Sequence, residues 1–265
     1  MTDKKEKLDI VGSIGNATQV VFSFDTTGSM APAIADVKKK MKESIAEMFK
    51  NIPGLEIGLI AHGDYCDGDD CIKILQLTKD QKAVEEFIKS APATAGGDSD
   101  ECYELVLKTA RIIGWLADDN PGKVFVMIGD ASPHGINYPN NKEKLDWKDE
   151  LLKLTGMGIN VYALQCLYKE HRQEENKFWE DISKISRTPL LKLDTFGESA
   201  HTLSAIAHAA AGTEVYTQYR SARNNAVASG EVETSAAFDA RLNSLSAELH
   251  KYDRKDKKET KDESA

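Results

Sequence analysis

The sequence predicts an α/β fold: a doubly wound, Rossmann-like, mostly parallel sheet with one antiparallel edge strand and a C-terminal helical extension. Short apolar runs alternate with segments of helical periodicity, which is typical of parallel strands joined by right-handed helical crossovers. Two of the apolar runs end in an aspartate, the residue type that often follows a buried strand at a ligand-binding edge. The chain of 265 residues is long enough for one sizeable domain and an appendage.

The strands are predicted from short runs rich in β-branched and aromatic residues. VVFSFD at 20–25 and KVFVMIGD at 123–130 are largely apolar up to their final aspartate, as expected for strands buried on both faces. Further strands are predicted at 55–62, 72–77, 159–165 and 190–193. The 72–77 run follows its predecessor too closely for a helical crossover, so we expect an antiparallel hairpin at the edge of the sheet.

Helices are predicted between these strands, where apolar residues recur at spacings of three and four. The clearest one follows the first strand, runs through Ile34 and Met48, and ends at Pro53-Gly54. The remaining helices are expected near 80–90, 101–117, 143–156, 175–186 and 198–211.

Composition divides the chain into four parts. They are an N-terminal tail at 1–17, the α/β domain at 18–212, a helical extension at 213–250 and a charged tail at 251–265. The charged tail lacks apolar anchors, so we expect it to be disordered. The extension carries three leucines at helical spacing, too few for a coiled coil, and core packing is the expectation for it.

Charge and cysteine content favour a cytoplasmic protein that binds neither nucleic acid nor membrane. The formal net charge of −9 argues against nonspecific binding to a phosphate backbone. No stretch approaches the ~20 continuous apolar residues that span a bilayer, and no signal peptide is apparent. Four cysteines are too few for a disulfide scaffold, which leaves the cytoplasm as the default compartment.

Candidate ligand-binding residues follow two of the predicted strands. The first strand continues as Asp25-Thr26-Thr27-Gly28-Ser29, and alternation along this turn places the hydroxyls of Thr27 and Ser29 beside the Asp25 carboxylate. Asp130 ends the later strand, and a loop at 94–101 adds further hydroxyl and carboxylate groups. Hard oxygen donors of this kind suit Mg²⁺. Ordinary turn and N-cap chemistry is the alternative for the first motif alone.

This arrangement resembles the metal-ion-dependent adhesion site of von Willebrand factor A (VWA) domains. Asp25-x-Thr27-x-Ser29 resembles the first element of that site, and it follows the first hydrophobic strand as in the family. Asp130, within GDASPHG, resembles the last ligand of the family. The resemblance covers roughly residues 18–212.

The middle element of the family is matched less directly. The loop GGDSDE resembles a variant in which glycines, an aspartate and a glutamate replace the more familiar threonine loop. On this basis the middle ligand is assigned to Asp98, with Thr94 as the alternative.

The resemblance implies a domain that binds a protein partner or ligand through a metal. No obvious nucleophile with its base is present in the sequence, so we do not expect an enzyme. Thr27 and Ser29 would coordinate the ion directly, whereas Asp25 and Asp130 would act mostly through water. Such an ion keeps net positive character and accepts a carboxylate from the partner. The implied metal is Mg²⁺, or else Mn²⁺ or Ca²⁺, and the implied role is that of a subunit or adaptor in a larger assembly.

Two other functions fit parts of the pattern. A Mg²⁺-dependent aspartyl phosphatase of the haloacid dehalogenase type also places an aspartate after its first strand. That class has a second acid two residues later, where this chain has Thr27, so the general acid is missing. An adaptor that serves an ATPase or kinase system is the third interpretation, and no feature of the sequence tests it.

The remaining polar residues near strand ends receive structural interpretations. His62 and His134 are expected to be hydrogen-bonded, because the oxygen donors around them make Zn²⁺ less favoured. Asp64 lies at the same predicted sheet edge and could line the ligand face, but a solvated acidic hairpin loop is preferred over a second metal site. Cys66 and Cys71 lack the spacing of structural zinc pairs and are interpreted as buried or incidental thiols.

Overall fold

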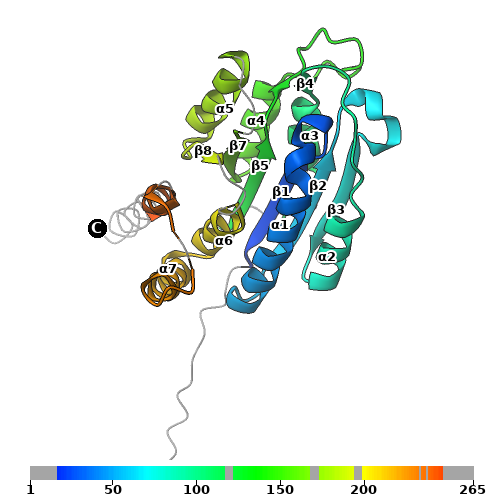
Figure 1. Ribbon diagram of the computed structural model, residues 1–265. Helices are drawn as coiled ribbons and strands as arrows, with labels where there is room; N and C mark the ends of the chain where they lie inside the picture. Colours follow the sequence, from blue (N-terminus) through cyan, green and yellow to red (C-terminus); the bar gives the residue numbers. More distant parts are fainter. Residues whose placement is uncertain are drawn as a thin grey trace, which may run out of the picture.

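The computed structural model describes residues 17–116, 122–167, 173–193, 199–232, 234–236 and 238–246. Within these ranges, helices cover both faces of a six-stranded sheet (Figure 1). The predicted charged tail at 251–265 and nearly all of the N-terminal tail at 1–17 lie outside the described residues.

The sheet has the strand order β3-β2-β1-β5-β7-β8. Its strands are β1 (Gln19–Asp25), β2 (Glu56–His62), β3 (Ile72–Thr78), β5 (Lys123–Gly129), β7 (Asn160–Cys166) and β8 (Leu191–Leu193). All neighbouring pairs are parallel except β2 and β3, which confirms the predicted antiparallel edge strand. Every residue of β1 and β5 is buried, because these strands are central and helices pack on both of their faces.

Alternating side chains of the strands feed two separate hydrophobic clusters. Phe22 and Phe24 of β1 pack with α1 (Ala31–Asn51), α2 (Gln81–Ser90) and α6 (Ser199–Ala210) on one face. Val21 of β1 and Phe125 of β5 pack on the other face. That second face is covered by α3 (Tyr103–Arg111), α4 (Trp147–Gly156) and α5 (Gln173–Ser186). The predicted doubly wound α/β architecture is confirmed.

The structure also contains a second sheet, of two strands, that the sequence did not predict. β4 (Asp100–Glu101) pairs in parallel with β6 (Ser132–Pro133), and so joins the loop before α3 to the segment after β5. Two short 3₁₀ helices, η1 (Gly28–Met30) and η2 (Tyr65–Asp70), follow β1 and β2. The helix predicted over 101–117 is shorter than expected, and it ends before Gly114, whose φ of 78° lies outside the helical region.

The C-terminal extension packs against the same core as α1 and α6. It contains α7 (Thr213–Ala228) and a further helix at 238–246. Tyr216, Phe238, Leu242 and Leu245 belong to the α1/α6 hydrophobic cluster, and the Tyr216 hydroxyl donates to the carbonyl of Leu242 over 2.8 Å. In the described part of the chain, no helix has the length and apolar character needed to cross a membrane.

Candidate metal centre

The first predicted site residue, Asp25, ends β1 and is fully buried. Its Oδ1 accepts hydrogen bonds from the backbone N of Thr27 at 2.8 Å and from the Thr27 hydroxyl at 2.7 Å. An aspartate that binds the backbone two residues later forms a local turn, which explains the spacing of the Asp-Thr-Thr motif. The turn holds the Thr27 hydroxyl beside the carboxylate, as the alternation of the sequence predicts.

Asp130 reaches the same place from the neighbouring strand. β1 and β5 are paired in parallel, so their carboxyl ends share one edge of the sheet. The Ser29 hydroxyl donates to Asp130 Oδ1 over 3.0 Å and lies 3.3 Å from the Thr27 hydroxyl. The structure therefore brings four of the predicted site residues together, and we call Asp25, Thr27, Ser29 and Asp130 the strand-end site.

Tyr103, the first residue of α3, contacts both aspartates of the strand-end site. The sequence did not identify it as a site residue. Its fully buried hydroxyl donates to Asp25 Oδ2 over 2.9 Å and accepts a hydrogen bond from the backbone N of Asp130 over 3.2 Å. A Cβ atom at Gly129 would lie 1.9 Å from this hydroxyl, so a glycine is needed there. One phenol thus connects the two strand ends.

Glu101 is the acidic residue of the 94–101 loop that approaches the strand-end site. It is buried, and its Oε2 has no hydrogen-bond partner among the described residues. Gly96 lies between Glu101 and Thr27. A Cβ atom added at Gly96 would lie 3.2 Å from Glu101 Oε1 and 3.5 Å from the Cβ of Thr27. Burial, followed by the negative charges of Asp25 and Asp64, raises the pKa of the Glu101 carboxyl to about 10.

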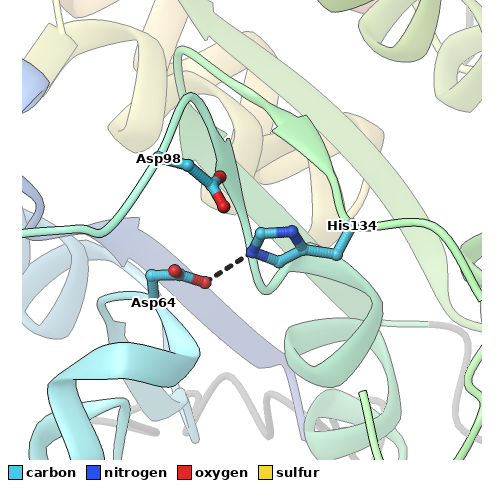
Figure 2. A group of neighbouring side chains, drawn as sticks. All are labelled: Asp64, Asp98 and His134. Atoms are coloured by element: carbon cyan, nitrogen blue, oxygen red, sulfur yellow. Dashed lines mark hydrogen bonds and ion pairs between the residues drawn. The ribbon is translucent and has the colours of Figure 1, made fainter. Parts of the chain in front are cut away.

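The two residues assigned to the middle ligand position have other neighbours. The hydroxyl of Thr94 lies 3.0 Å from that of Thr26, and the backbone N of Thr94 donates to the Thr26 carbonyl. Asp98 is exposed and is grouped with Asp64 and His134 (Figure 2). From the same loop it is Glu101, which the sequence marks only as one of several acids, that lies beside Thr27.

The two histidines differ from each other in their surroundings. His62 ends β2, is fully buried edge-on against the Tyr103 ring, and neither of its ring nitrogens has a hydrogen-bond partner among the described residues. Burial lowers the pKa of His62 to about 3, which keeps the imidazole neutral. The expectation of a simple hydrogen-bonded histidine is therefore wrong for His62, whereas His134 does form a hydrogen bond, to Asp64.

Asp64 and the cysteines also have defined positions. The predicted solvated loop is wrong for Asp64, which is fully buried, although Asp69 and Asp70 of the same segment are exposed. Cys66 is exposed and Cys71 is buried, as free thiols.

Comparison with known proteins informs the fold. No family model matches the chain, and no curated protein matches it. Among solved structures, the pilus adhesin SpaC from Lactobacillus rhamnosus GG has a TM-score of 0.56 and 15% identity over 74% of this chain, which spans only 30% of SpaC. The conserved hypothetical protein BatB from Bacteroides thetaiotaomicron has a TM-score of 0.53 and 14% identity, over 74% of this chain and 99% of BatB. The chain shares the fold of these proteins.

A third similar structure is proximal thread matrix protein 1 from the mussel byssus. It has a TM-score of 0.52 and 17% identity, over 73% of this chain and 47% of that protein. At these identities the likeness extends to the fold alone, and the function of this domain has to be argued from its own side chains.

Proposed function

We propose that this VWA-like domain binds a divalent metal at the strand-end site and uses the metal to bind an acidic residue of a protein partner. The proposal rests chiefly on the convergence of two hydroxyls and two carboxylates: Thr27 donates to Asp25, Ser29 donates to Asp130, and the two hydroxyl oxygens lie 3.3 Å apart. These residues come from two strand ends, and the contact between Ser29 and Asp130 joins positions 101 residues apart.

The hydroxyl geometry supports a cation at this position. Thr27 donates its single hydroxyl proton to Asp25, and Ser29 donates its own to Asp130. With both protons used in this way, the two hydroxyl oxygens, 3.3 Å apart, face each other through their lone pairs. A cation bound by both oxygens would remove the repulsion between their lone pairs. Hard oxygen donors favour Mg²⁺, with Mn²⁺ and Ca²⁺ as alternatives.

The crowding of buried acids supports the same conclusion. After burial itself, the negative charges of Asp25, Asp64 and Asp130 contribute to the raised pKa of Glu101. A divalent ion would supply the positive charge that these carboxylates need when buried together. We infer that Glu101 is a stronger candidate than Asp98 or Thr94 for the ligand from the 94–101 loop.

Each residue of the strand-end site then has a distinct role. Thr27 and Ser29 would hold the ion through their hydroxyl oxygens, while Asp25 and Asp130 orient those hydroxyls by accepting their protons. The bound ion supplies an electrophilic position for a partner carboxylate. Tyr103 would position the two aspartates relative to each other through its hydroxyl.

Binding, without catalysis, is the function that these residues support best. In the phosphatase alternative, the residue two positions after the first aspartate is a carboxylic acid that protonates the leaving group. Here that residue is Thr27, which has no carboxyl group and donates its hydroxyl proton to Asp25 in a hydrogen bond. One of the similar structures, SpaC, is a pilus adhesin, which agrees with a binding role. We expect the domain to act in the cytoplasm as a subunit or adaptor of a larger assembly.

Titration of Mg²⁺ into the chelator-stripped chain, followed by calorimetry, tests the metal site. Asp25→Ala is expected to abolish Mg²⁺ binding while thermal unfolding stays cooperative. Ser29→Ala provides a second variant, because Ser29 is exposed and its replacement leaves the core untouched. Asp80→Ala, which removes the N-cap of α2, serves as the control and keeps full affinity. Unchanged Mg²⁺ affinity in Asp25→Ala and Ser29→Ala would refute the site.

Partner binding is tested separately by affinity capture with and without EDTA. Partners that bind through the metal are lost both on chelation and when Ser29→Ala is the bait. A partner that is retained under both conditions contradicts the metal-bridged mode, even where Mg²⁺ binding itself is confirmed.

A further inference from the structure

A second group of potential metal ligands lies beside the strand-end site. Asp64 follows β2, Asp98 lies in the 94–101 loop, and His134 follows β6. One ligand atom from each of the three lies within 4.8 Å of the other two. Figure 2 shows the three side chains converging from three separate segments of the chain. We call these three residues the Asp64 cluster.

Two members of the Asp64 cluster are buried, which distinguishes it from a surface patch of acids. Asp64 is 0% exposed and His134 is 3% exposed. His134 Nε2 lies 2.6 Å from Asp64 Oδ1, so these two side chains are held in direct contact. Asp98 is exposed, and it places the second carboxylate of the cluster on the side from which an ion would enter.

The second carboxylate oxygen of Asp64 points to a missing ligand. Asp64 Oδ2 is buried and has no hydrogen-bond partner among the described residues. It is turned toward the loop that carries Asp98, because a Cβ at Gly97 would lie 3.4 Å from it. A buried carboxylate oxygen that lacks a donor is costly, and a bound cation is one of the few groups that satisfies it.

The surroundings of the Asp64 cluster hold its ligands in place. The His134 ring stacks on Tyr138 with a centroid distance of 3.7 Å, which restricts the orientation of the imidazole. Asp67 Oδ2 accepts from the backbone N of Asp64 over 2.8 Å, and its Oδ1 accepts from the backbone N of Ala95 over 3.0 Å. Asp67 thereby ties together the two loops that carry Asp64 and Asp98, and an ordered outer shell of this kind favours metal binding.

We propose that Asp64, Asp98 and His134 form a second cation site, which takes a transition-metal ion, Zn²⁺ in first place. An imidazole nitrogen beside two carboxylates is a donor set for ions such as Zn²⁺, Mn²⁺ or Co²⁺ and differs from the all-oxygen set of the strand-end site. The exposed thiol of Cys66 lies on the same side, since a Cβ at Gly97 would be 2.9 Å from its sulfur. A nearby thiol further favours Zn²⁺.

Three protein ligands leave a coordination position of the ion for water or an added ligand. The strand-end site and the Asp64 cluster are joined through the small sheet, because Glu101 of β4 pairs with Pro133 of β6 and its carbonyl accepts from the backbone N of His134. The second site does not depend on the first for its ligands. Its existence can therefore be tested independently of the proposed function.

Titration of Zn²⁺ into the full chain, stripped of metal and then held in saturating Mg²⁺, tests the second site by calorimetry. One equivalent of Zn²⁺ is expected to bind to the wild-type chain. Asp98→Asn and His134→Phe are expected to weaken this binding by more than the about 10–100-fold that loss of an outer-shell partner costs, because each removes a direct ligand. Asp98 is exposed, so Asp98→Asn preserves the fold even where His134→Phe does not.

Two control variants separate the second site from its surroundings. Asp69→Asn changes an exposed acid of the same segment that lies outside the cluster, and it is expected to bind Zn²⁺ like the wild type. Ser29→Ala is expected to lose Mg²⁺ and keep Zn²⁺, whereas Asp98→Asn keeps Mg²⁺. Zn²⁺ binding that is unchanged in Asp98→Asn, or that disappears in Ser29→Ala, would overturn the second site without affecting the Mg²⁺ proposal.

Discussion

Replacing Tyr103 by phenylalanine tests whether one buried hydroxyl joins the ends of β1 and β5. The substitution keeps the aromatic ring in the core and removes only the oxygen. That oxygen donates to Asp25 Oδ2 and accepts from the backbone N of Asp130. Burial and the charge of Asp25 hold the pKa of Tyr103 well above its usual value, so the phenol is a neutral donor at every pH of interest.

The expected loss of stability follows from these contacts. A hydrogen bond to a charged group contributes about 1.5–3 kcal/mol, and a buried N–H left without an acceptor costs about 1–3 kcal/mol. Because the two effects share one oxygen atom, we expect a total of about 2–4 kcal/mol. Tyr216→Phe is the matched control, since the Tyr216 hydroxyl is also buried but donates to a neutral carbonyl, that of Leu242. Its removal is expected to cost about 1 kcal/mol.

Urea unfolding in EDTA, monitored by circular dichroism, measures both free energies of unfolding. If the variants and the wild type have the same m-value, the difference in the free energy of unfolding reflects the loss of native contacts, without a change in the denatured state. Tyr103→Phe is also expected to weaken Mg²⁺ binding by about 10–100-fold, because Asp25 loses a residue that orients it. If Tyr103→Phe costs no more than Tyr216→Phe, and Mg²⁺ affinity is unchanged, the hydroxyl does not join the two strand ends.

Three further changes test other parts of the structure. Gly129→Ala places a Cβ atom 1.9 Å from the Tyr103 hydroxyl and is expected to destabilise the fold by about 3 kcal/mol in urea unfolding; a cost near zero would mean that the tyrosine moves freely. His62 is kept neutral by a pKa lowered from 6.5 to about 3, so its contribution to stability is present above pH 6.5 and is lost as the pH falls. Between pH 7 and 5 the free energy of unfolding should decrease by about 2 kcal/mol more in the wild type than in His62→Phe, and parallel pH curves would contradict this. Phe238→Ala is expected to cost about 3–5 kcal/mol because Phe238 is fully buried, and an unchanged melting temperature would instead indicate that the extension is a separate arm.

The strands of the sheet were predictable because each is a short run of mostly apolar residues in the sequence. The runs that became β1 and β5 are apolar along most of their length, since helices cover both of their faces. The antiparallel position of β3 followed from the short connection after β2. β4 and β6 were not predicted, because a strand of two residues has no periodicity to detect.

The strand-end site was predictable to the extent that its residues are close in sequence or end a recognisable strand. Asp25, Thr27 and Ser29 occupy a single turn, in which backbone geometry alone brings their oxygens together. Asp130 directly follows a strand with a clear apolar pattern. Parallel strands end at a common edge, which placed the two motifs on the same side of the sheet, but the pairing of β1 with β5 that brings Ser29 to Asp130 was decided by the tertiary structure.

Local sequence determined the strands, their order of appearance and the turn that gathers Asp25, Thr27 and Ser29. The tertiary structure decided which partners from distant segments complete the two sites. Tyr103 lies 78 residues from Asp25, and His134 lies 70 residues from Asp64. Such contacts depend on how loops are fixed against one another, here by the pairing of β4 with β6, and no short-range pattern encodes that pairing.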